Sequence, residues 1–225
     1  MSGETCEKCG YPKRDPCYGC EQIEANKKRT AAVSRARFAA IARSLGGARC
    51  VLEFTRERFK VSHQNRAVFR ACDSFSPESE NLYLWSQRSG TGKSHLAIIA
   101  ARKFIEAGVV GRIVKPAEIF REIRRAYDEG SKENDADILG ELIRLPILVL
   151  DDLGTQKDTE WSNATFYDLI EGRYSHRPGG LIVTANLSLE QAEARWGTRI
   201  GSRFAQMFGK LVFDLSAEKD HRRIQ

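Results

Sequence analysis

The fold is decided by a stretch in the middle of the chain, residues 81–97, which reads NLYLWSQRSGTGKSHLA. Its apolar start, Asn81-Leu-Tyr-Leu-Trp85, predicts a buried strand, and the apolar run from Ala97 onward predicts a helix. A glycine-rich turn between a strand and a helix is typical of phosphate-binding loops, where backbone N–H groups and a helix N-terminus surround the phosphates. We therefore predict that the chain binds a nucleoside triphosphate.

Two side chains of this loop have predicted roles in nucleotide binding. We expect Lys93 to reach the β and γ phosphates and the Ser94 hydroxyl to hold Mg²⁺. Gln87 stands where the usual loop motif has its first glycine, so it must adopt an ordinary backbone conformation or bear strain. The predicted nucleotide-binding residues are Ser89, Gly90, Thr91, Gly92, Lys93, Ser94 and His95.

Two carboxylates follow a second apolar run, residues 147–150. A run that is apolar at every position predicts a strand buried on both faces, and ligands of open α/β sheets bind at the carboxyl ends of the strands. We predict that Asp151 supports Mg²⁺ together with Ser94, and that Asp152 orients or deprotonates the attacking water. Asp152 is one methylene shorter than the Glu more often found there, so we expect slow hydrolysis.

A third strand-like run, residues 181–184, leads to Asn186. Its amide is suited to positioning water against the γ phosphate, or alternatively to capping the following helix. Further on, Arg199 and Arg203 lie four residues apart and share one helix face. An arginine supplied across a subunit interface stabilises transition-state charge on a γ phosphate. The competing interpretation is plain surface charge, because the chain contains 36 Lys and Arg residues.

Strand and helix signals alternate along the chain from about residue 80, which predicts an α/β fold with a parallel sheet and helices on both faces. The predicted strands are 82–86, 111–115, 147–151, 181–185 and 211–215, and the predicted helices are 94–107, 117–127, 160–175 and 189–206. The helix at 117–127 is rich in basic and aromatic residues. It is suited to holding DNA in a channel, although Phe120 and Tyr127 are equally well explained as packed side chains.

Four cysteines near the N-terminus form two C-x-x-C pairs, Cys6 with Cys9 and Cys17 with Cys20. Two such pairs complete the tetrahedral sulfur shell that Zn²⁺ prefers, and two disulfides are the alternative. About twenty residues cannot bury a sufficient core, so metal binding would supply much of the folding energy. We predict a zinc-binding module at 1–22, a basic helical arm at 23–48 and the nucleotide-binding domain at 49–225.

Composition agrees with one large core and a small appendage, since the chain has 225 residues. The net charge of +6 favours contact with polyanions. The basic arm is interpreted as a docking element for a protein partner, a nucleic-acid contact or a solvated helix face. No stretch is apolar enough for a signal peptide or a membrane span, so we expect a cytoplasmic protein and no membrane contact.

Taken together, the motifs resemble the DnaC/DnaI/IstB branch of the AAA+ ATPases. The resemblance is carried by Asn81-Leu-Tyr-Leu84, Ser89 to Ala97, Ile147 to Gly154, Thr184 to Glu190 and Arg199 to Phe204. It implies an AAA+ core that binds ATP and Mg²⁺ and assembles head to tail. It also implies that Asn186 senses the γ phosphate and that Arg203, with Arg199 next, is the interface arginine. The chain stops soon after Leu215, which implies that the core has no C-terminal helical lid.

In the DnaC and DnaI members, the resemblance implies loading of a ring-shaped replicative helicase onto single-stranded DNA. We therefore predict an ATP-dependent helicase loader that binds a hexameric DNA helicase and single-stranded DNA, with the zinc module engaging the helicase. One alternative is an IstB-like transposition ATPase that coats DNA. Another, favoured by Gln87 and Asp152, is a nucleotide-gated adaptor with little hydrolysis.

Overall fold

Five parallel strands form the centre of the molecule in the order β2-β3-β4-β1-β5. Their bounds are Leu82–Trp85 for β1, Gly111–Val114 for β2, Ile147–Leu153 for β3, Leu181–Ala185 for β4 and Val212–Asp214 for β5. The computed structural model describes residues 24, 53–78, 80–128, 135–176 and 179–219. The cysteine pairs and almost all of the basic arm lie outside these residues.

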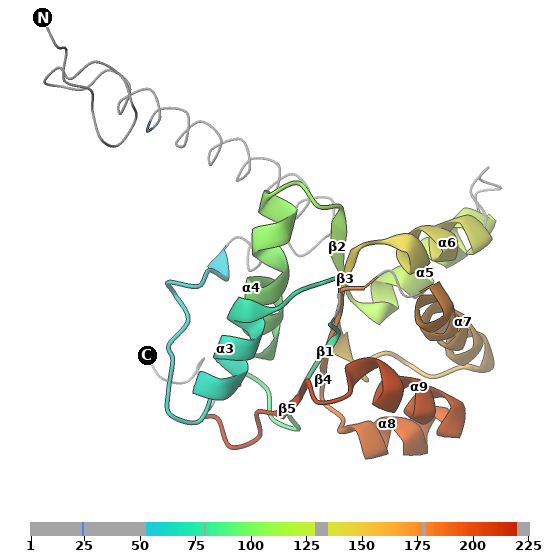
Figure 1. Cartoon of the computed structure of the whole chain (residues 1–225). Coiled ribbons are helices and arrows are strands. Elements are labelled where there is room, and N and C mark those ends of the chain that lie inside the picture. The colour runs from blue at the N-terminus through green and yellow to red at the C-terminus, as the bar shows by residue number, and fades with distance from the viewer. Residues whose placement is uncertain (1–23, 25–52, 79, 129–134, 177–178, 220–225) are drawn as a thin grey trace, which may run out of the picture.

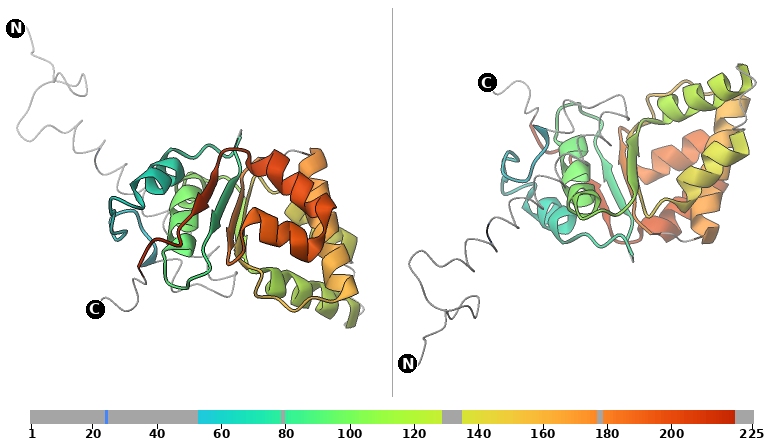
Figure 2. Two further views of the ribbon diagram at one scale, coloured as in Figure 1. Left: turned by 90° about the horizontal axis from the view of Figure 1, so that it is seen from below. Right: turned by 90° about the horizontal axis from the view of Figure 1, so that it is seen from above.

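Helices cover both faces of the sheet, as the alternating pattern predicts (Figures 1 and 2). One face carries α3 and α4, and the other carries α5 to α9. The bounds are Arg66–Ser74 for α3, Lys93–Glu106 for α4, Pro116–Asp128 for α5, Asp135–Arg144 for α6, Glu160–His176 for α7, Leu189–Trp196 for α8 and Thr198–Phe208 for α9.

The apolar runs of the strands divide between two cores. Along β1, Leu82 and Leu84 face the core beneath α3 and α4, whereas Tyr83 lies in the core beneath α5 to α9. In β3, Val149 and Leu150 divide in the same way. Successive strand residues point to opposite faces, so a strand covered on both sides needs apolar residues at every position. This explains why the central strands are easily recognised in the sequence.

Three helical features differ from the prediction. Helices α3 and α6 were not expected, and the single helix predicted over 189–206 is wrong, because the chain breaks between α8 and α9 at Gly197. Gly197 has φ 90° and ψ 164°, a conformation that glycine adopts without a side-chain penalty. The helical spacing of apolar residues continues past this break, which hides it in the sequence. Within the described residues, no helix is long and apolar enough to cross a membrane.

A buried arginine joins α6 to the rest of the second core. Arg173, on α7, donates through Nη1 to the carbonyl oxygens of Leu142 at 2.8 Å, Ile143 at 3.3 Å and Leu145 at 3.0 Å. Its Nη2 donates to the carbonyl of Gly179. Burial lowers the pKa of Arg173 to about 10, so the group stays charged at neutral pH. The guanidinium therefore satisfies the final carbonyls of α6, which have no partner within their own helix.

Replacing this arginine should destabilise the fold. Arg173→Met preserves most of the side-chain volume but leaves buried carbonyls without donors, and we expect a loss of about 3 kcal/mol in the free energy of unfolding. Urea denaturation followed by circular dichroism measures it. The control is Arg70→Met, at an exposed position of α3, which should change stability by less than about 0.5 kcal/mol. Equal effects of the two substitutions would contradict the structural role of Arg173.

Candidate nucleotide-binding site

The glycine-rich loop runs from the end of β1 to the start of α4. Gly90 and Gly92 have positive φ angles of 74° and 90°. The backbone conformation of Gly92 favours glycine, and a Cβ there would be tight, at 3.1 Å from the ring of Phe59. No side chain caps α4, whose N-cap residue is Gly92. The first-turn N–H groups of α4 are thus oriented toward an external acceptor, as in helices that bind phosphate.

Lys93 folds back onto the loop. Its Nζ donates to the carbonyl of Ser86 at 3.3 Å and to that of Arg88 at 3.0 Å. The ammonium group is thereby held within the loop that the sequence assigns to phosphate. Gln87, which replaces the first glycine of the usual loop motif, is exposed and does not have a positive φ. It adopts the ordinary backbone conformation rather than the strained one.

One carboxylate oxygen joins three segments at the edge of the sheet. Asp151 Oδ1, on β3, accepts a hydrogen bond of 2.7 Å from Ser94 Oγ at the start of α4. The same oxygen accepts a second hydrogen bond, also of 2.7 Å, from Thr184 Oγ1 on β4. Carboxylate and hydroxyl oxygens are hard ligands of the kind Mg²⁺ prefers. Mg²⁺ keeps several water ligands and takes few ligands from the protein, so a small number of protein oxygens is enough. Ser94 and Asp151 therefore fit a magnesium–nucleotide site.

Asp152 has an unusual backbone. Its φ of 64° is the sole positive value among the described non-glycine residues, and such conformations cost about 1–3 kcal/mol and cluster at functional sites. Aspartate tolerates the left-handed region better than most residues. The backbone N–H of Asp152 donates to Thr184 Oγ1 at 2.8 Å, and its carboxylate lies 3.6 Å from Lys115 Nζ. Thr184 therefore fixes the positions of both acids.

Asn186 follows β4 beside these acids. Its side-chain oxygen Oδ1 is buried and has no hydrogen-bond partner among the described residues. A Cβ at Gly154 would lie 2.3 Å from this atom, so the glycine leaves room for the amide. Ser188 is the N-cap of α8 and forms a capping box with Gln191, which removes the helix-capping role considered for Asn186. An unpaired buried acceptor beside two carboxylates fits a group that binds ligand or water.

The side chains of His95, Thr91 and Ser89 lie in three different environments. His95 Nε2 donates to the carbonyl of Thr55 at 2.7 Å, and its ring stacks on Phe54 with centroids 4.7 Å apart. The His95 side chain thus anchors the segment before α3. Thr91 is buried and its Oγ1 has no partner among the described residues, whereas Ser89 is exposed.

The two candidate interface arginines lie on α9. Arg203 forms an ion pair with Glu171 on α7, with Nε–Oε2 and Nη2–Oε1 distances of 2.7 and 3.2 Å. Its guanidinium also lies 4.1 Å from the ring centroid of Tyr174. The hydrogen bond from Arg203 lowers the pKa of Glu171 below its usual value. Arg203 is therefore held within its own protomer in this structure.

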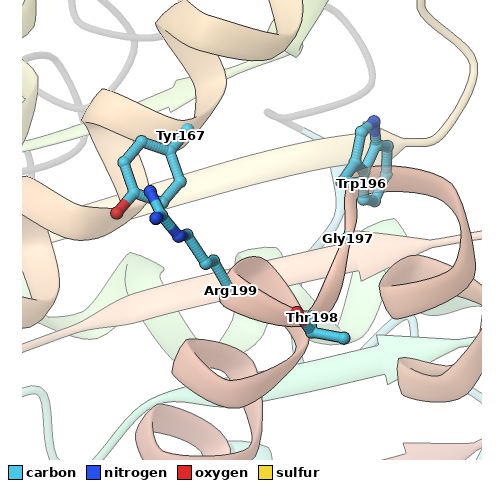
Figure 3. Close-up of a pocket in the computed structure, with 5 residues that line it drawn as sticks. All are labelled: Tyr167, Trp196, Gly197, Thr198 and Arg199. Carbon is cyan, nitrogen blue, oxygen red and sulfur yellow. The ribbon is translucent and has the colours of Figure 1, made fainter.

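Arg199 is exposed and lines a surface pocket between α7 and the start of α9 (Figure 3). The pocket is completed by Tyr167, Trp196, Gly197 and Thr198. In Figure 3 the Arg199 side chain points toward the ring of Tyr167. The two arginines thus share a surface but differ in their partners.

Sequence reasoning missed several residues of this region. Thr184 connects the two acids, and Lys115 lies beside Asp152. Glu171 holds Arg203, and Arg195 contacts the loop after β3. Thr184 and Lys115 were detectable in principle, because each stands at the carboxyl end of a predicted strand. Glu171 and Arg195 lie on helix surfaces, where nothing in their sequence neighbourhood separates them from other charged residues.

Comparison with known proteins gives matches to one family model and to several curated relatives. Residues 25–203 match the family model described as IstB-like ATP binding protein. The chain belongs to this family. Curated relatives include the uncharacterized protein YdaV of Escherichia coli, 28% identical over 131 residues, and the replicative helicase loader DnaC of the same species, 24% identical over 153 residues. These matches cover 58% and 67% of this chain, but 51% and 61% of the relatives.

Solved structures agree with the family assignment. A crystal structure of the DnaC helicase loader aligns with a TM-score of 0.60 and 25% identity, covering 74% of this chain and 99% of that one. The family member described here thus has the α/β core of this branch, a five-stranded parallel sheet flanked by helices. The sequence motifs predicted an AAA+ core that binds ATP. The family match and the aligned DnaC structure confirm the AAA+ type of the core, and ATP binding is part of the family's description.

The cluster of Ser94, Asp151 and Thr184 generates a prediction about metal dependence. Asp151→Asn weakens the oxygen ligand set, so we expect Mg²⁺ to lose its effect on ATP affinity, with binding in Mg²⁺ at least about tenfold weaker than wild type. Titration with a fluorescent ATP analogue, in Mg²⁺ and in EDTA, measures this. Asp152→Asn is the matched control and should retain the Mg²⁺ effect. A full Mg²⁺ effect in Asp151→Asn would remove this residue from the metal site.

Proposed function

We propose that this protein is an ATP-dependent helicase loader, which binds a hexameric replicative helicase and single-stranded DNA during replication initiation. The observation that carries the proposal is the joint presence of the nucleotide-site geometry around Asp151 and a fold that covers the whole aligned DnaC loader chain. The chain spans about half to three fifths of the length of its curated relatives, so its activity and partners are part of the proposal.

The proposed mechanism assigns one task to each residue of the site. Lys93 and the N–H groups of the loop bind the phosphates of ATP, and Ser94 with Asp151 would hold Mg²⁺, which neutralises phosphate charge when bound. Asp152 accepts a proton from the attacking water, and Asn186 orients that water. Arg203, or else Arg199, stabilises the γ phosphate of a neighbouring protomer in a head-to-tail assembly.

The N-terminal segment has its own proposed task. Cys6, Cys9, Cys17 and Cys20 would bind Zn²⁺, and this module with the basic arm at 23–48 would engage the helicase. The proposed domain boundaries are therefore 1–22, 23–48 and 49–225. Cytoplasmic location follows from the same proposal, because the helicase and its DNA are found there.

The first experiment is co-migration of the full chain with its host's replicative helicase on a sizing column, with and without ATP. We expect a stable complex that is lost when Cys6 and Cys9 are both replaced by Ser, with loss of bound zinc. A full-chain variant such as Lys93→Ala separates nucleotide effects from docking. No complex in any nucleotide state would refute the loader and favour an IstB-like transposition ATPase, which the family description also supports. That alternative predicts coating of double-stranded DNA.

Helix α5 is the proposed surface for single-stranded DNA. Arg121, Arg124 and Arg125 are exposed on it, and the Arg124 guanidinium lies 4.9 Å from the ring centroid of Trp161. Phe120 is buried against Trp161 instead, so its role is packing. A cationic helix beside an indole ring suits a backbone that is held by charge and bases that stack.

Replacing one of these arginines should weaken DNA binding. For Arg124→Ala we expect lower affinity for oligo(dT). The slope of the logarithm of the binding constant against the logarithm of the salt concentration should become smaller by about 1, because one phosphate contact is lost. Fluorescence anisotropy at several salt concentrations measures both. Arg70→Ala on α3, on the opposite face of the sheet, is the control. Identical salt dependence of Arg124→Ala and wild type would exclude α5 as the DNA surface.

The ion pair of Arg203 generates a prediction about turnover. Glu171 competes with a neighbour's γ phosphate for Arg203, so Glu171→Gln should raise ATP turnover at limiting protein concentration. We expect a rise of at most about fivefold, because a single, partly exposed ion pair contributes little free energy. Asp73→Asn, which removes the similar pair with Arg56, should leave turnover unchanged. Turnover should be measured across a protein concentration series. A fall in Glu171→Gln would mean that Glu171 positions Arg203 rather than competing for it.

In the adaptor alternative, ATP binding alone sets the assembly state and hydrolysis is dispensable, whereas the proposed loader depends on hydrolysis. Asp152→Asn with full loading activity would favour the adaptor.

A further inference from the structure

The strained acid of the site, Asp152, lies at the end of β3, directly before the loop 154–158. Asp152 has a φ of 64°, and Gly154 has a φ of 100°. Two contacts stabilise the turn from within: Thr155 Oγ1 donates to the carbonyl of Asp152, and the N–H of Gly154 donates to Gln156 Oε1, both at 2.9 Å. A strained backbone persists only where the surrounding structure fixes it from several sides. Thr184 holds the Asp152 end of this segment from β4, and the loop 154–158 is held from outside at its other end.

Arg195, on α8, supplies that contact with its whole guanidinium group. Nη1 donates to the carbonyl of Gly154, and Nη2 donates to the carbonyl of Gln156 at 3.0 Å. Nε forms an ion pair of 2.7 Å with Asp158 Oδ2. The guanidinium also lies 5.0 Å from the ring centroid of Trp196. Three nitrogens of one planar group thus bind three successive points of a single loop.

Lysine cannot reproduce this arrangement. A guanidinium presents its donors in a rigid plane, whereas an ammonium is a single point charge on a flexible stem. Arg195 is a quarter exposed and Asp158 a third exposed, so the ion pair alone contributes little. The two hydrogen bonds to the carbonyls of Gly154 and Gln156 matter more, because they fix the positions of the peptide groups that follow Asp152.

We propose that Arg195 is a positioning residue for ATP hydrolysis, which holds the loop 154–158 so that the Asp152 carboxylate stays in its catalytic position. This inference rests on the proposed ATPase function of the same site. Arg195 acts through the loop, and Lys93 with the glycine-rich loop binds the nucleotide from another segment. Its loss should therefore affect turnover and leave nucleotide affinity intact.

The test compares Arg195→Lys and Arg195→Ala with wild-type full-length protein. We expect kcat to fall by about 10- to 100-fold, since displacing a catalytic group by about 1 Å has an effect of that size. The dissociation constant of a fluorescent ATP analogue should change less than about twofold. Non-denaturing guanidinium chloride should restore part of the turnover of Arg195→Ala but none in Arg195→Lys. Asp158→Asn, which preserves both carbonyl contacts, should lose much less activity than Arg195→Lys.

Arg112→Lys is the matched control, because Arg112 binds one carboxylate, that of Glu122, which a lysine can also reach. Hydrogen exchange of amides 152–158, measured by mass spectrometry, should be faster in Arg195→Lys than in Arg112→Lys. Unchanged exchange, or faster exchange with unchanged kcat, would overturn the inference. If the wild type binds ATP but never hydrolyses it, the ATPase proposal fails, and the exchange experiment still decides whether Arg195 holds the loop.

Discussion

The candidate site depends on the hydrogen bonds that Asp151 Oδ1 accepts from Ser94 and Thr184. This oxygen connects helix α4, which follows the glycine-rich loop, to two neighbouring strands, β3 and β4. The connection is possible because all strands are parallel, so their carboxyl ends meet at one edge and deliver polar residues to the same place. The apolar residues of β1, β3 and β4 are mostly buried under helices on both faces, which holds that edge in place beside α4.

Around this edge, the backbone departs from ordinary conformations where the site needs close approach. Gly92 lies against the ring of Phe59 and Gly154 against the amide of Asn186, each with a positive φ; a Cβ would be tight at Gly92 and has no room at Gly154. Asp152 has a similar conformation with a side chain present, which costs free energy that the core must offset. This backbone strain lies at the second of the two carboxylates. Thr184 contacts the strained residue itself, and Arg195 contacts the loop that follows it.

The sequence predicted the sheet, the glycine-rich loop and the two acids because each follows from a short local pattern. Buried strands are apolar at every position, and the loop combines glycines with Lys93 and Ser94. It did not predict the break at Gly197, because the apolar spacing of α8 continues into α9 and a single glycine within a helical pattern is common. Nor did it identify Glu171 or Arg195, since contacts between segments far apart in the sequence depend on tertiary packing. A charged residue on a helix surface has the same local sequence whether its partner is water or a loop carbonyl.

The pairing of Arg203 bears on how the site would be completed. Arg203 lies on the surface formed by α7 and α9, where Glu171 and Tyr174 occupy its guanidinium. In the proposed assembly, one protomer would therefore contribute two separate groups of residues: the acids and loop at the sheet edge, and the arginines on the α7–α9 surface. Arg195 lies between them, since it binds the loop after β3 and is followed within α8 by Trp196, which lines the same pocket as Arg199. Arg195 thus connects the helix that leads into this surface with the loop that directly follows the strained Asp152.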